Sequence, residues 1–495
     1  MPTIGFRTMK CVCKNLVVVV FLTMLFHSQL FARDVDPEVN EAQAFNHSVM
    51  EPSFQPSGEP SKSAFQSSLS PSESRIDEAS IKSLSIKELV NIPLTIDYDK
   101  AQIYQSDINQ MGKKTVNYGF IVPISEYPAY SSEVVAAADM AAEYINQHGG
   151  INGRRLVLLR ADDQENTPVS ARLAKRLVEE FNVEAIIGPA TSDSVADVLK
   201  RVALPKNIPM ISHSASSMKL VNMGANHPFW RMVTNNQQQI KLMTEFMYQE
   251  KGHKKVFIFS GRGIYSEEIR QGVIDFYRPI KDTHTDFMAI SNLVTLANMN
   301  LEDEFKAIQA SGVTALLITL QNHQVIPILR KIKQHWRGDF PLIIIGDNAT
   351  RKYLVDAQLG SISECILTYV ASTTHLSPEL QEKIMKQFDV DTSLFDAAYI
   401  YDATMLLAMG QTLAERFNLS MKEAVNAIAS DGYPIKYSDF PNLIELYKKH
   451  KKFQYQGYSG RVHFNSVGDN LVAYMKLYPL AETDKNPPCL NKLSQ

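Results

Sequence analysis

Cysteine and catalytic signatures are scarce in this chain of 495 residues. It has four cysteines, no phosphate-binding glycine loop and no Gly-x-Ser-x-Gly nucleophile elbow. Its twelve histidines never fall at the spacing of a metal site. These absences disfavour an enzyme, and we expect neither a metal nor a cofactor.

An excess of charge is missing as well. Lys and Arg total 50 while Asp and Glu total 53, so the chain lacks the basic surplus that proteins use to bind nucleic acid. We therefore expect no nucleic-acid partner. Long hydrophobic runs are absent beyond residue 32, where no window approaches the roughly 20 apolar residues that a membrane-spanning helix needs.

Residues 1–32 have the pattern of a secretory signal peptide. Three basic residues precede an apolar run from Leu16 to Phe26, and Leu30-Phe31-Ala32 offers a cleavage site. An uncleaved membrane anchor is the alternative. Cleavage removes three basic residues and no acidic one, which leaves a net charge of −6 on the secreted mature protein. Cys365 and Cys489 would then lie in an oxidising compartment, but the sequence does not set their distance, so their pairing stays open.

The composition after the signal predicts a disordered linker over residues 33–80. Residues 46–75 contain ten serines and four prolines with few branched apolar side chains. Such a stretch cannot bury enough surface to offset the entropy lost on ordering. Residues 81–114 follow, and we expect them to form a short segment that docks on the main body.

The main body begins near Thr115 and alternates apolar strands with amphipathic helices. Its strands are continuous apolar runs, which predicts an α/β fold of parallel sheets covered by helices on both faces. A polar break at residues 235–239 separates two such series, so we expect two doubly wound lobes. The expected strands are 118–122, 156–159, 185–187 and 209–211 in the first series and 256–259, 287–290, 315–320 and 342–345 in the second.

Further elements are expected around these strands. Ser131 or Ser132 has the side chain to cap the helix that follows the first strand. A long helix over residues 395–417 and a β-hairpin over residues 461–477 come after the second series. These last elements must be shared between the two lobes.

Two serine-rich loops follow neighbouring predicted strands of the first series. They are Gly188–Ser194 and Ser212–Ser217. Ligands of open α/β sheets bind at the carboxyl ends of the strands, where short hydroxyls and free backbone N–H groups hold small anions. The pair of loops therefore predicts a site for a carboxylate or another small anion. The alternative is that the serines only cap two helices.

Further motifs run along the main body in a characteristic order. They are Asn146–Gly153, Asp162-Asp163, the loop after Gly188, Pro209–Ser212 with Ser214–Ser216, Tyr265, Tyr458–Phe464 and Gly468-Asp469. From about Val116 to Tyr478 the chain resembles the type 1 periplasmic binding proteins. Within them it is similar to the branched-chain amino acid receptors of ABC transporters, the relatives of leucine-binding protein.

The resemblance implies two lobes joined by a three-stranded hinge, with a ligand in the cleft between them. We expect lobe 1 to comprise residues 115–235 plus about 371–450. Lobe 2 is expected to comprise residues 236–370 plus about 451–482. Residues 483–495 would form a C-terminal tail.

The resemblance also implies a set of site residues. Lobe 1 would hold the ligand carboxylate with Ser192 or Ser194 and with Ser214, Ala215 and Ser216. Tyr265 of lobe 2 would close over the ligand, and Asp347 would meet its ammonium group. Tyr127 and Tyr130 fall where the family often has an aromatic wall.

Three features depart from the family pattern. The family's common N-terminal disulfide is missing, since residues 164–165 and 190–191 contain no cysteine. Gln321 stands where relatives often have a ligand-facing aromatic residue, and the N-terminal extension is not part of a typical receptor. Asp347 has the alternative role of capping the next helix. We expect a secreted receptor that binds a small polar ligand, an amino acid, and presents it to an inner-membrane ABC permease or a sensor. The alternative is an interaction or sensory protein that kept the fold without amino acid binding.

Overall fold

The computed structural model describes residues 102–224, 227–290, 301–349, 351–371, 377–390, 395–473, 475–481 and 488–491. The predicted signal peptide and linker lie outside these residues, as does the docking segment before residue 102. The described residues all belong to one compact unit, Asp77–Gln495. Within this unit the chain builds two lobes, each around its own β-sheet.

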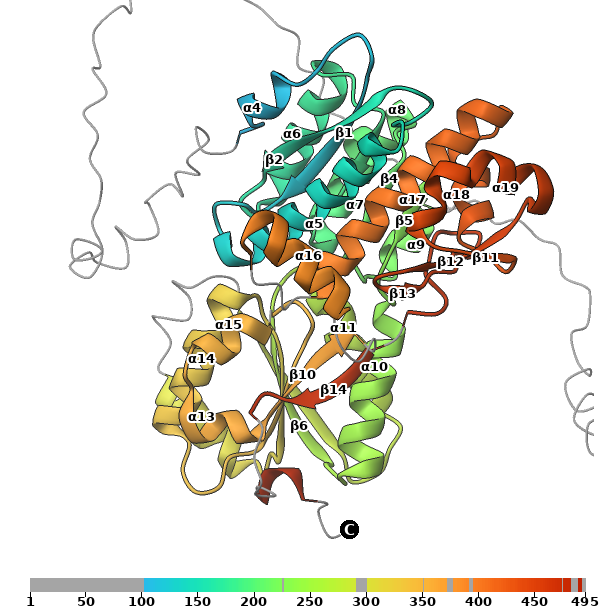
Figure 1. The fold of residues 1–495 in the computed structure, drawn as a ribbon. Coiled ribbons are helices and arrows are strands. Elements are labelled where there is room, and N and C mark those ends of the chain that lie inside the picture. Colours follow the sequence, from blue (N-terminus) through green and yellow to red (C-terminus); the bar gives the residue numbers. More distant parts are fainter. Residues whose placement is uncertain are drawn as a thin grey trace, which may run out of the picture. The chain divides into compact units, whose positions relative to one another are not determined.

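Lobe 1 contains a five-stranded parallel sheet in the order β2-β1-β3-β4-β5. Successive side chains of a strand point to opposite faces, so each strand serves two helical layers. Tyr118 and Phe120 of β1 belong to the core under α5 and α17, whereas Ile121 belongs to the core under α6 and α7 (Figure 1). The strands are β1 (Thr115–Val122), β2 (Arg155–Asp162), β3 (Ala185–Ile187), β4 (Met210–Ser212) and β5 (Phe229–Arg231), and the helices are α5 (Pro128–Gln147), α6 (Thr167–Glu179), α7 (Ser192–Val198) and α17 (Phe395–Phe417).

Lobe 2 contains a six-stranded sheet in the order β14-β10-β9-β8-β6-β7, in which only β14 is antiparallel to its neighbour. All four residues of β9 are buried. Leu342 and Ile344 pack toward α10 and α11, and Ile343 and Ile345 pack toward the opposite helices. Burial of each such side chain contributes about 1.5–3 kcal/mol. The strands are β6 (Lys255–Ser260), β7 (His284–Ala289), β8 (Ala315–Thr319), β9 (Leu342–Ile345), β10 (Ile366–Ala371) and β14 (Met475–Pro479), and the helices are α10 (Asn236–Thr244), α11 (Ile264–Tyr277), α13 (Leu301–Ala310), α14 (Asn322–His335) and α15 (Arg351–Asp356).

The start of α5 differs from the prediction. The helix begins at Pro128, with Tyr127 as its N-cap residue, and neither Ser131 nor Ser132 caps it. Proline suits the first turn because its missing N–H would have no helical partner there. Ser131 lies inside the helix instead, and its hydroxyl donates a hydrogen bond to the Pro123 carbonyl.

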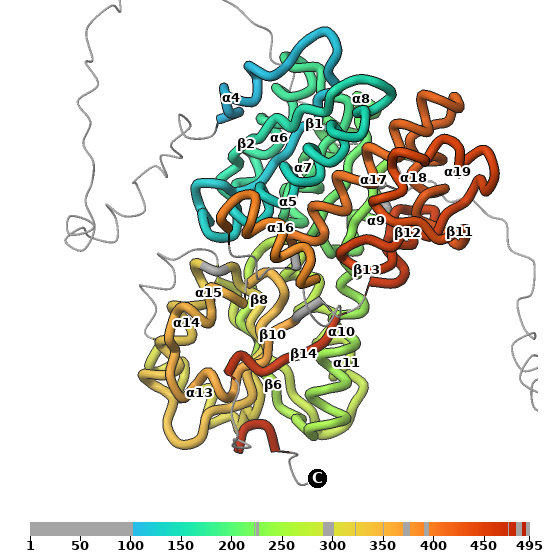
Figure 2. The backbone as a smooth tube through the Cα atoms, viewed as in Figure 1, coloured from blue at the N-terminus to red at the C-terminus, as the bar shows by residue number. Residues whose placement is uncertain are grey.

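The segment after α17 corrects two further predictions. Here α18 (Met421–Ile428), α19 (Leu443–His450) and a small sheet of β11 (Tyr433–Ile435), β12 (Phe453–Gly457) and β13 (Gly460–Arg461) lie beside lobe 1 (Figure 2). Phe453, Tyr455, Val462 and Phe464 belong to the lobe 1 core, so this stretch does not join lobe 2 as expected. The predicted hairpin over 461–477 is also wrong, because β13 pairs with β12 and β14 pairs with β10.

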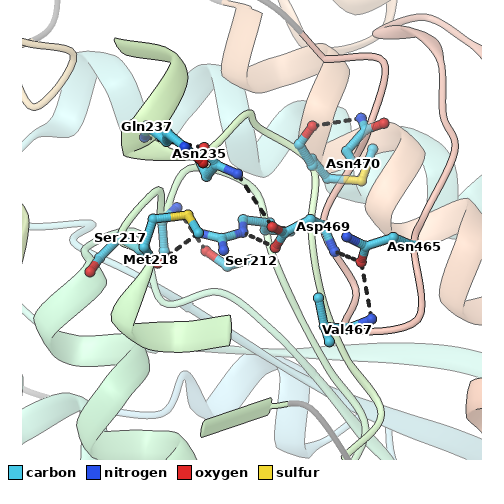
Figure 3. Close-up of polar contacts among 12 residues, drawn as sticks. Ser212, Ser217, Met218, Asn235, Gln237, Asn465, Val467, Asp469 and Asn470 are labelled. Carbon is cyan, nitrogen blue, oxygen red and sulfur yellow. Dashed lines mark hydrogen bonds and ion pairs between the residues drawn. The ribbon is translucent and has the colours of Figure 1, made fainter. Parts of the chain in front are cut away.

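Along its described part the chain passes between the lobes three times, after β5, after β10 and before β14. Two of these crossings are joined by a buried ion pair, in which Arg231 Nε lies 2.6 Å from Asp469 Oδ1. Arg231 is fully buried and also donates to the Ser217 carbonyl. Figure 3 shows Asp469 between Asn235 on the first crossing and Asn465 on its own segment.

The backbone around this ion pair requires glycine at one position. Gly468 has a φ of +89°, and a Cβ atom there would lie 1.9 Å from the Phe229 carbonyl oxygen. Any side chain would therefore separate the third crossing from β5. The close approach lets the Gly468 carbonyl accept a hydrogen bond from the Arg231 N–H.

The ends of the described chain are attached to different lobes. At the N-terminal end, Ile103 forms a bridge with Ala161 of β2, and buried Asp107 pairs with Arg160. These contacts agree with docking on the main body for the part of the segment that the structure describes. At the other end, Cys365 and Cys489 form a disulfide with a Cα–Cα distance of 5.7 Å, which answers the question that the sequence left open. It holds the C-terminal turn against lobe 2.

Within the described ranges, no helix combines the length and the apolar character needed to cross a membrane.

Replacing Asp469 with alanine should destabilise the fold by about 3–5 kcal/mol, because it leaves the Arg231 guanidinium buried without its partner. Chemical denaturation measures this loss directly. Asp431→Ala is the matched control, since its pair with Arg461 lies at the surface and is worth less than about 1 kcal/mol. Equal effects of the two variants would show that the buried pair does not hold the hinge.

Candidate functional site

A cavity of about 290 Å³ lies between the two lobes at the carboxyl ends of their strands. Both sheets contribute to it, since the loops after β1, β2, β3 and β4 face the loops after β6, β8 and β9. From lobe 1 the lining residues are Pro123, Tyr127, Tyr130, Glu165, Ala190, Thr191, Ser192, Asp193, Ser214, Ser216 and Asp396. From lobe 2 they are Gly261, Arg262, Gly263, Tyr265, Ser266, Ile290, Thr319, Gln321, Gln324, Asp347 and Asn348.

The loop after β4 presents free hydrogen-bond donors to the cavity. The N–H groups of Ala215 and Ser217 are used inside lobe 1, where they donate to Ser212 Oγ and Ser192 Oγ. The N–H groups of Ser214 and Ser216 alternate with them and have no acceptor among the described residues. Ser214 and Ser216 both line the cavity, so this edge can receive an anion.

The hydroxyls of the serine loops have different roles. Ser192 Oγ accepts the Ser217 N–H, and Ser214 Oγ donates to the Ala190 carbonyl, so both fix the loops to each other. The hydroxyl of Ser216 has no partner in the described part of the chain, although the residue is only 1% exposed. Among the predicted serines, Ser216 is thus the one whose side chain remains available to a ligand.

Two predicted residues lie behind the wall of the cavity rather than on it. Ser194 is buried, its N–H donates to Thr191 Oγ1, and its Oγ lies 3.3 Å from Thr167 Oγ1. Ala215 is buried beside Ser212. Both residues support the loops, and neither touches the cavity.

On lobe 2, Tyr265 and Asp347 belong to one hydrogen-bonded group. The Tyr265 hydroxyl donates to Gln239 Oε1 and accepts the Asp347 N–H, while Gln239 Nε2 donates to Asp347 Oδ2 at 2.6 Å. Burial raises the pKa of Asp347 to about 6, although its hydrogen bonds oppose that rise. No described residue donates to Asp347 Oδ1, so one carboxylate oxygen remains for a ligand.

Two acids that the sequence analysis did not single out also line the cavity. Glu165 follows β2 and accepts a hydrogen bond of 2.5 Å from the Tyr127 hydroxyl. Asp396 lies in the first turn of α17. Burial raises the pKa of both carboxyls to about 7, and the charge of Asp347 contributes to the rise at Asp396. The place of Glu165 in the loop after β2 is a signal that the sequence offers, whereas Asp396 has no comparable signal.

The predicted aromatic wall is built from the start of α5. Tyr127 and Tyr130 both line the cavity. The Tyr130 hydroxyl lies 2.6 Å from Nε2 of His213, a side chain whose burial lowers its pKa to about 3. The imidazole is therefore neutral, and it fixes the Tyr130 ring without adding positive charge to the cavity.

Polar contacts join the two lobes on both sides of the cavity. On one side both Asp193 carboxylate oxygens accept the Ile264 N–H at the start of α11. On the other side Lys352 of lobe 2 forms an ion pair of 3.1 Å with Glu133 of lobe 1. These contacts hold the two lobes together near the cavity.

The arrangement of the cavity suits the binding of a small ligand. The cavity combines anion donors on lobe 1 with a carboxylate on lobe 2, which is complementary to a small molecule with charges at both ends. No group of three or more candidate metal ligands occurs among the described residues. The geometry therefore defines the class of two-lobed proteins that hold a small ligand in a cleft.

The chain belongs to the periplasmic binding protein family, whose profile matches residues 115–410. Members of this family are solute-binding proteins. Type 1 periplasmic binding proteins have the same fold, as predicted. A solved solute-binding protein of an ABC transporter from R. palustris, in complex with benzoate, superimposes with a TM-score of 0.57 at 16% identity and covers 74% of this chain and 93% of its own.

Two further relatives match this chain over only part of their own length. Glutamate receptor 2.4 of Arabidopsis thaliana is 23% identical over 320 residues, which is 63% of this chain and 34% of the receptor. Leu/Ile/Val-binding protein homolog 3 of Brucella melitensis is 26% identical over 153 residues, which is 31% of this chain and 41% of that protein. This chain thus covers about a third of the Arabidopsis receptor and about two fifths of the Brucella protein.

Asp396→Asn should stabilise the ligand-free protein at pH 8 by about 1–3 kcal/mol. The raised pKa means that the folded state disfavours the charged carboxylate. The cost grows as the pH rises from about 4, the unfolded pKa, to about 7, the folded one, and stays constant above it. Denaturation at pH 4.5 and pH 8 should therefore give a gain that is small at the lower pH. Asp356→Asn, at an exposed position, is the control variant, and an equal response of both variants would contradict the prediction.

Proposed function

We propose that this protein is a non-catalytic receptor that captures an amino acid in the cleft between its lobes. Its signal pattern supports secretion to the periplasm. There it would deliver the ligand to an inner-membrane ABC permease or report it to a sensor. Residues 115–235 with about 371–470 would form the lobe that binds first, and lobe 2 would close over the ligand.

One observation carries the proposal, namely that free donors and a free acceptor face one cavity from opposite lobes. The N–H groups of Ser214 and Ser216 and the Ser216 hydroxyl would hold the α-carboxylate. Asp347 Oδ1 would accept the α-ammonium from the other side. An ammonium without an acceptor in a cavity closed to water is costly, so the two halves of the site act together.

The relatives support this assignment in part. The names of the Brucella relative and the R. palustris complex mention leucine, isoleucine, valine and benzoate, which all carry a carboxylate. Benzoate has no ammonium group, so a carboxylate site alone is the second candidate. The free oxygen of Asp347 favours an amino acid over a simple carboxylate.

Ser216→Ala should weaken binding of the tightest ligand in a panel of L-amino acids by about 1.5–3 kcal/mol, because it removes one hydrogen bond to a charged group. Isothermal titration calorimetry measures the change. Ser132→Ala is the control, since that hydroxyl lies on the exposed side of α5 and donates to the Ala129 carbonyl. Unchanged affinity of the Ser216 variant would place the carboxylate elsewhere.

Asp347→Asn should weaken the amino acid at least tenfold more than its des-amino analogue, because only the amino acid brings an ammonium group to this carboxylate. The comparison uses calorimetry with both compounds on both proteins. If Asp347 only fixes the start of α15, the variant should give a different result. In that case stability falls without ligand, and the preference between the two compounds stays the same.

A further inference from the structure

Few aliphatic side chains line the cavity, and tyrosine rings supply most of its apolar side chains. Within the described part of the chain its aliphatic lining is limited to Pro123, Ala190 and Ile290. Gln321 and Gln324 contribute amides from lobe 2, at the position where the sequence lacks an aromatic residue. A leucine or valine side chain would cover these polar groups without hydrogen bonding to them. The lining therefore favours a polar ligand side chain.

Acidic side chains in the lining outnumber basic ones. Four acids line the cavity, whereas Arg262 is the one basic lining residue among those described. Both oxygens of Asp193 accept the Ile264 N–H, which leaves Glu165, Asp347 and Asp396. Arg262 is exposed and forms no ion pair with these acids in the described structure. The nearby Lys352 is already paired with Glu133. No protein cation in this part of the chain balances the three acids.

Of these three acids, Asp396 has the fewest polar partners within the described part of the chain. Glu165 accepts from Tyr127, and Asp347 accepts from Gln239. The Asp396 carboxylate has no hydrogen bond or ion pair to another described side chain. Its raised pKa, caused first by burial and then by the charges of Asp347 and Glu133, is the electrostatic consequence.

The groups that line the cavity indicate which charges the ligand carries. The unpartnered hydroxyl of Ser216, in a residue that is 1% exposed, marks the carboxylate end of the site independently of the acids. One ammonium group satisfies Asp347. A zwitterion with a neutral side chain would then leave the half-buried Asp396 in the cavity without a counter-charge, which is unfavourable.

We infer that the ligand is an α-amino acid whose side chain carries a second positive charge, as in lysine, ornithine or arginine. Asp396 meets the side-chain cation. Glu165 lies close enough to act on the same Tyr130 hydroxyl as Asp396 and adds to the negative potential there. The inference rests on the proposed function, since it assumes that the α-carboxylate and α-ammonium bind as described above.

A set of lysine analogues tests each contact separately. Calorimetry on the full chain compares L-lysine with L-norleucine, which lacks the side-chain ammonium, with 6-aminohexanoate, which lacks the α-ammonium, and with cadaverine, which lacks the carboxylate. L-Lysine should bind at least tenfold more tightly than each analogue, since one hydrogen bond between charged groups is worth about a factor of 10 to 100.

Variants then assign the two cations to the two acids. Asp396→Asn should reduce lysine affinity at least tenfold and leave norleucine affinity within twofold. Asp347→Asn should instead reduce the preference for lysine over 6-aminohexanoate. Asp356→Asn, an exposed acid outside the cavity, should change none of these affinities.

The outcomes separate this inference from the proposed function. Norleucine or leucine binding as tightly as lysine would overturn the second cation and leave the amino acid receptor intact. An equal loss of lysine and norleucine affinity in Asp396→Asn would also overturn it, because Asp396 would then meet the α-ammonium. Cadaverine binding as tightly as lysine, or no binding by any amino acid, would overturn the proposed function itself.

Discussion

The buried ion pair between Arg231 and Asp469 connects two of the three crossings on which the two-lobed arrangement depends. The guanidinium also reaches the Ser217 carbonyl, at the end of the loop that presents the anion donors. Hinge and site are therefore parts of one polar network. A hydrophobic contact is non-directional and would hold the two crossings together without fixing their alignment. The hydrogen-bonded ion pair also fixes the register of the two segments. The geometry of the cleft follows from that register.

Much of the fold could be predicted because the strands are continuous apolar runs. The run at Leu342–Ile345 fills both faces of a parallel sheet, and this local signal needs no knowledge of its partners. β5 was not predicted, because it contains Arg231 and so lacks a continuous apolar run. In the structure Arg231 is buried and paired with Asp469. The hairpin failed for another reason. Strand character can be inferred locally, but β14 pairs with β10, more than a hundred residues earlier in the chain.

Some residues of the candidate site could likewise be predicted from local sequence motifs, and others depend on the tertiary fold. Ser214, Ser216, Tyr265 and Asp347 follow predicted strands or lie in recognisable loops, and the structure brings them to one cavity. Asp396 could not be predicted as a member, because an acid in the first turn of a helix is ordinary and favourable anywhere. Only the return of the chain to lobe 1 before α17 brings this turn to the cleft. Ser194 and Ala215 show the reverse case, since neighbouring loop positions alternate between facing the ligand and supporting the loop.

The two ends of the described chain are attached to different lobes, so the distance between them reports on the angle between the lobes. The segment around Ile103 and Asp107 is fixed to the edge strand of lobe 1, and the turn at Cys489 is covalently fixed to lobe 2. Neither attachment runs through the hinge. The distance between spectroscopic probes placed on these two segments would thus change with the angle between the lobes. For the same reason, a tether at either end would pull on one lobe and leave the other free to turn.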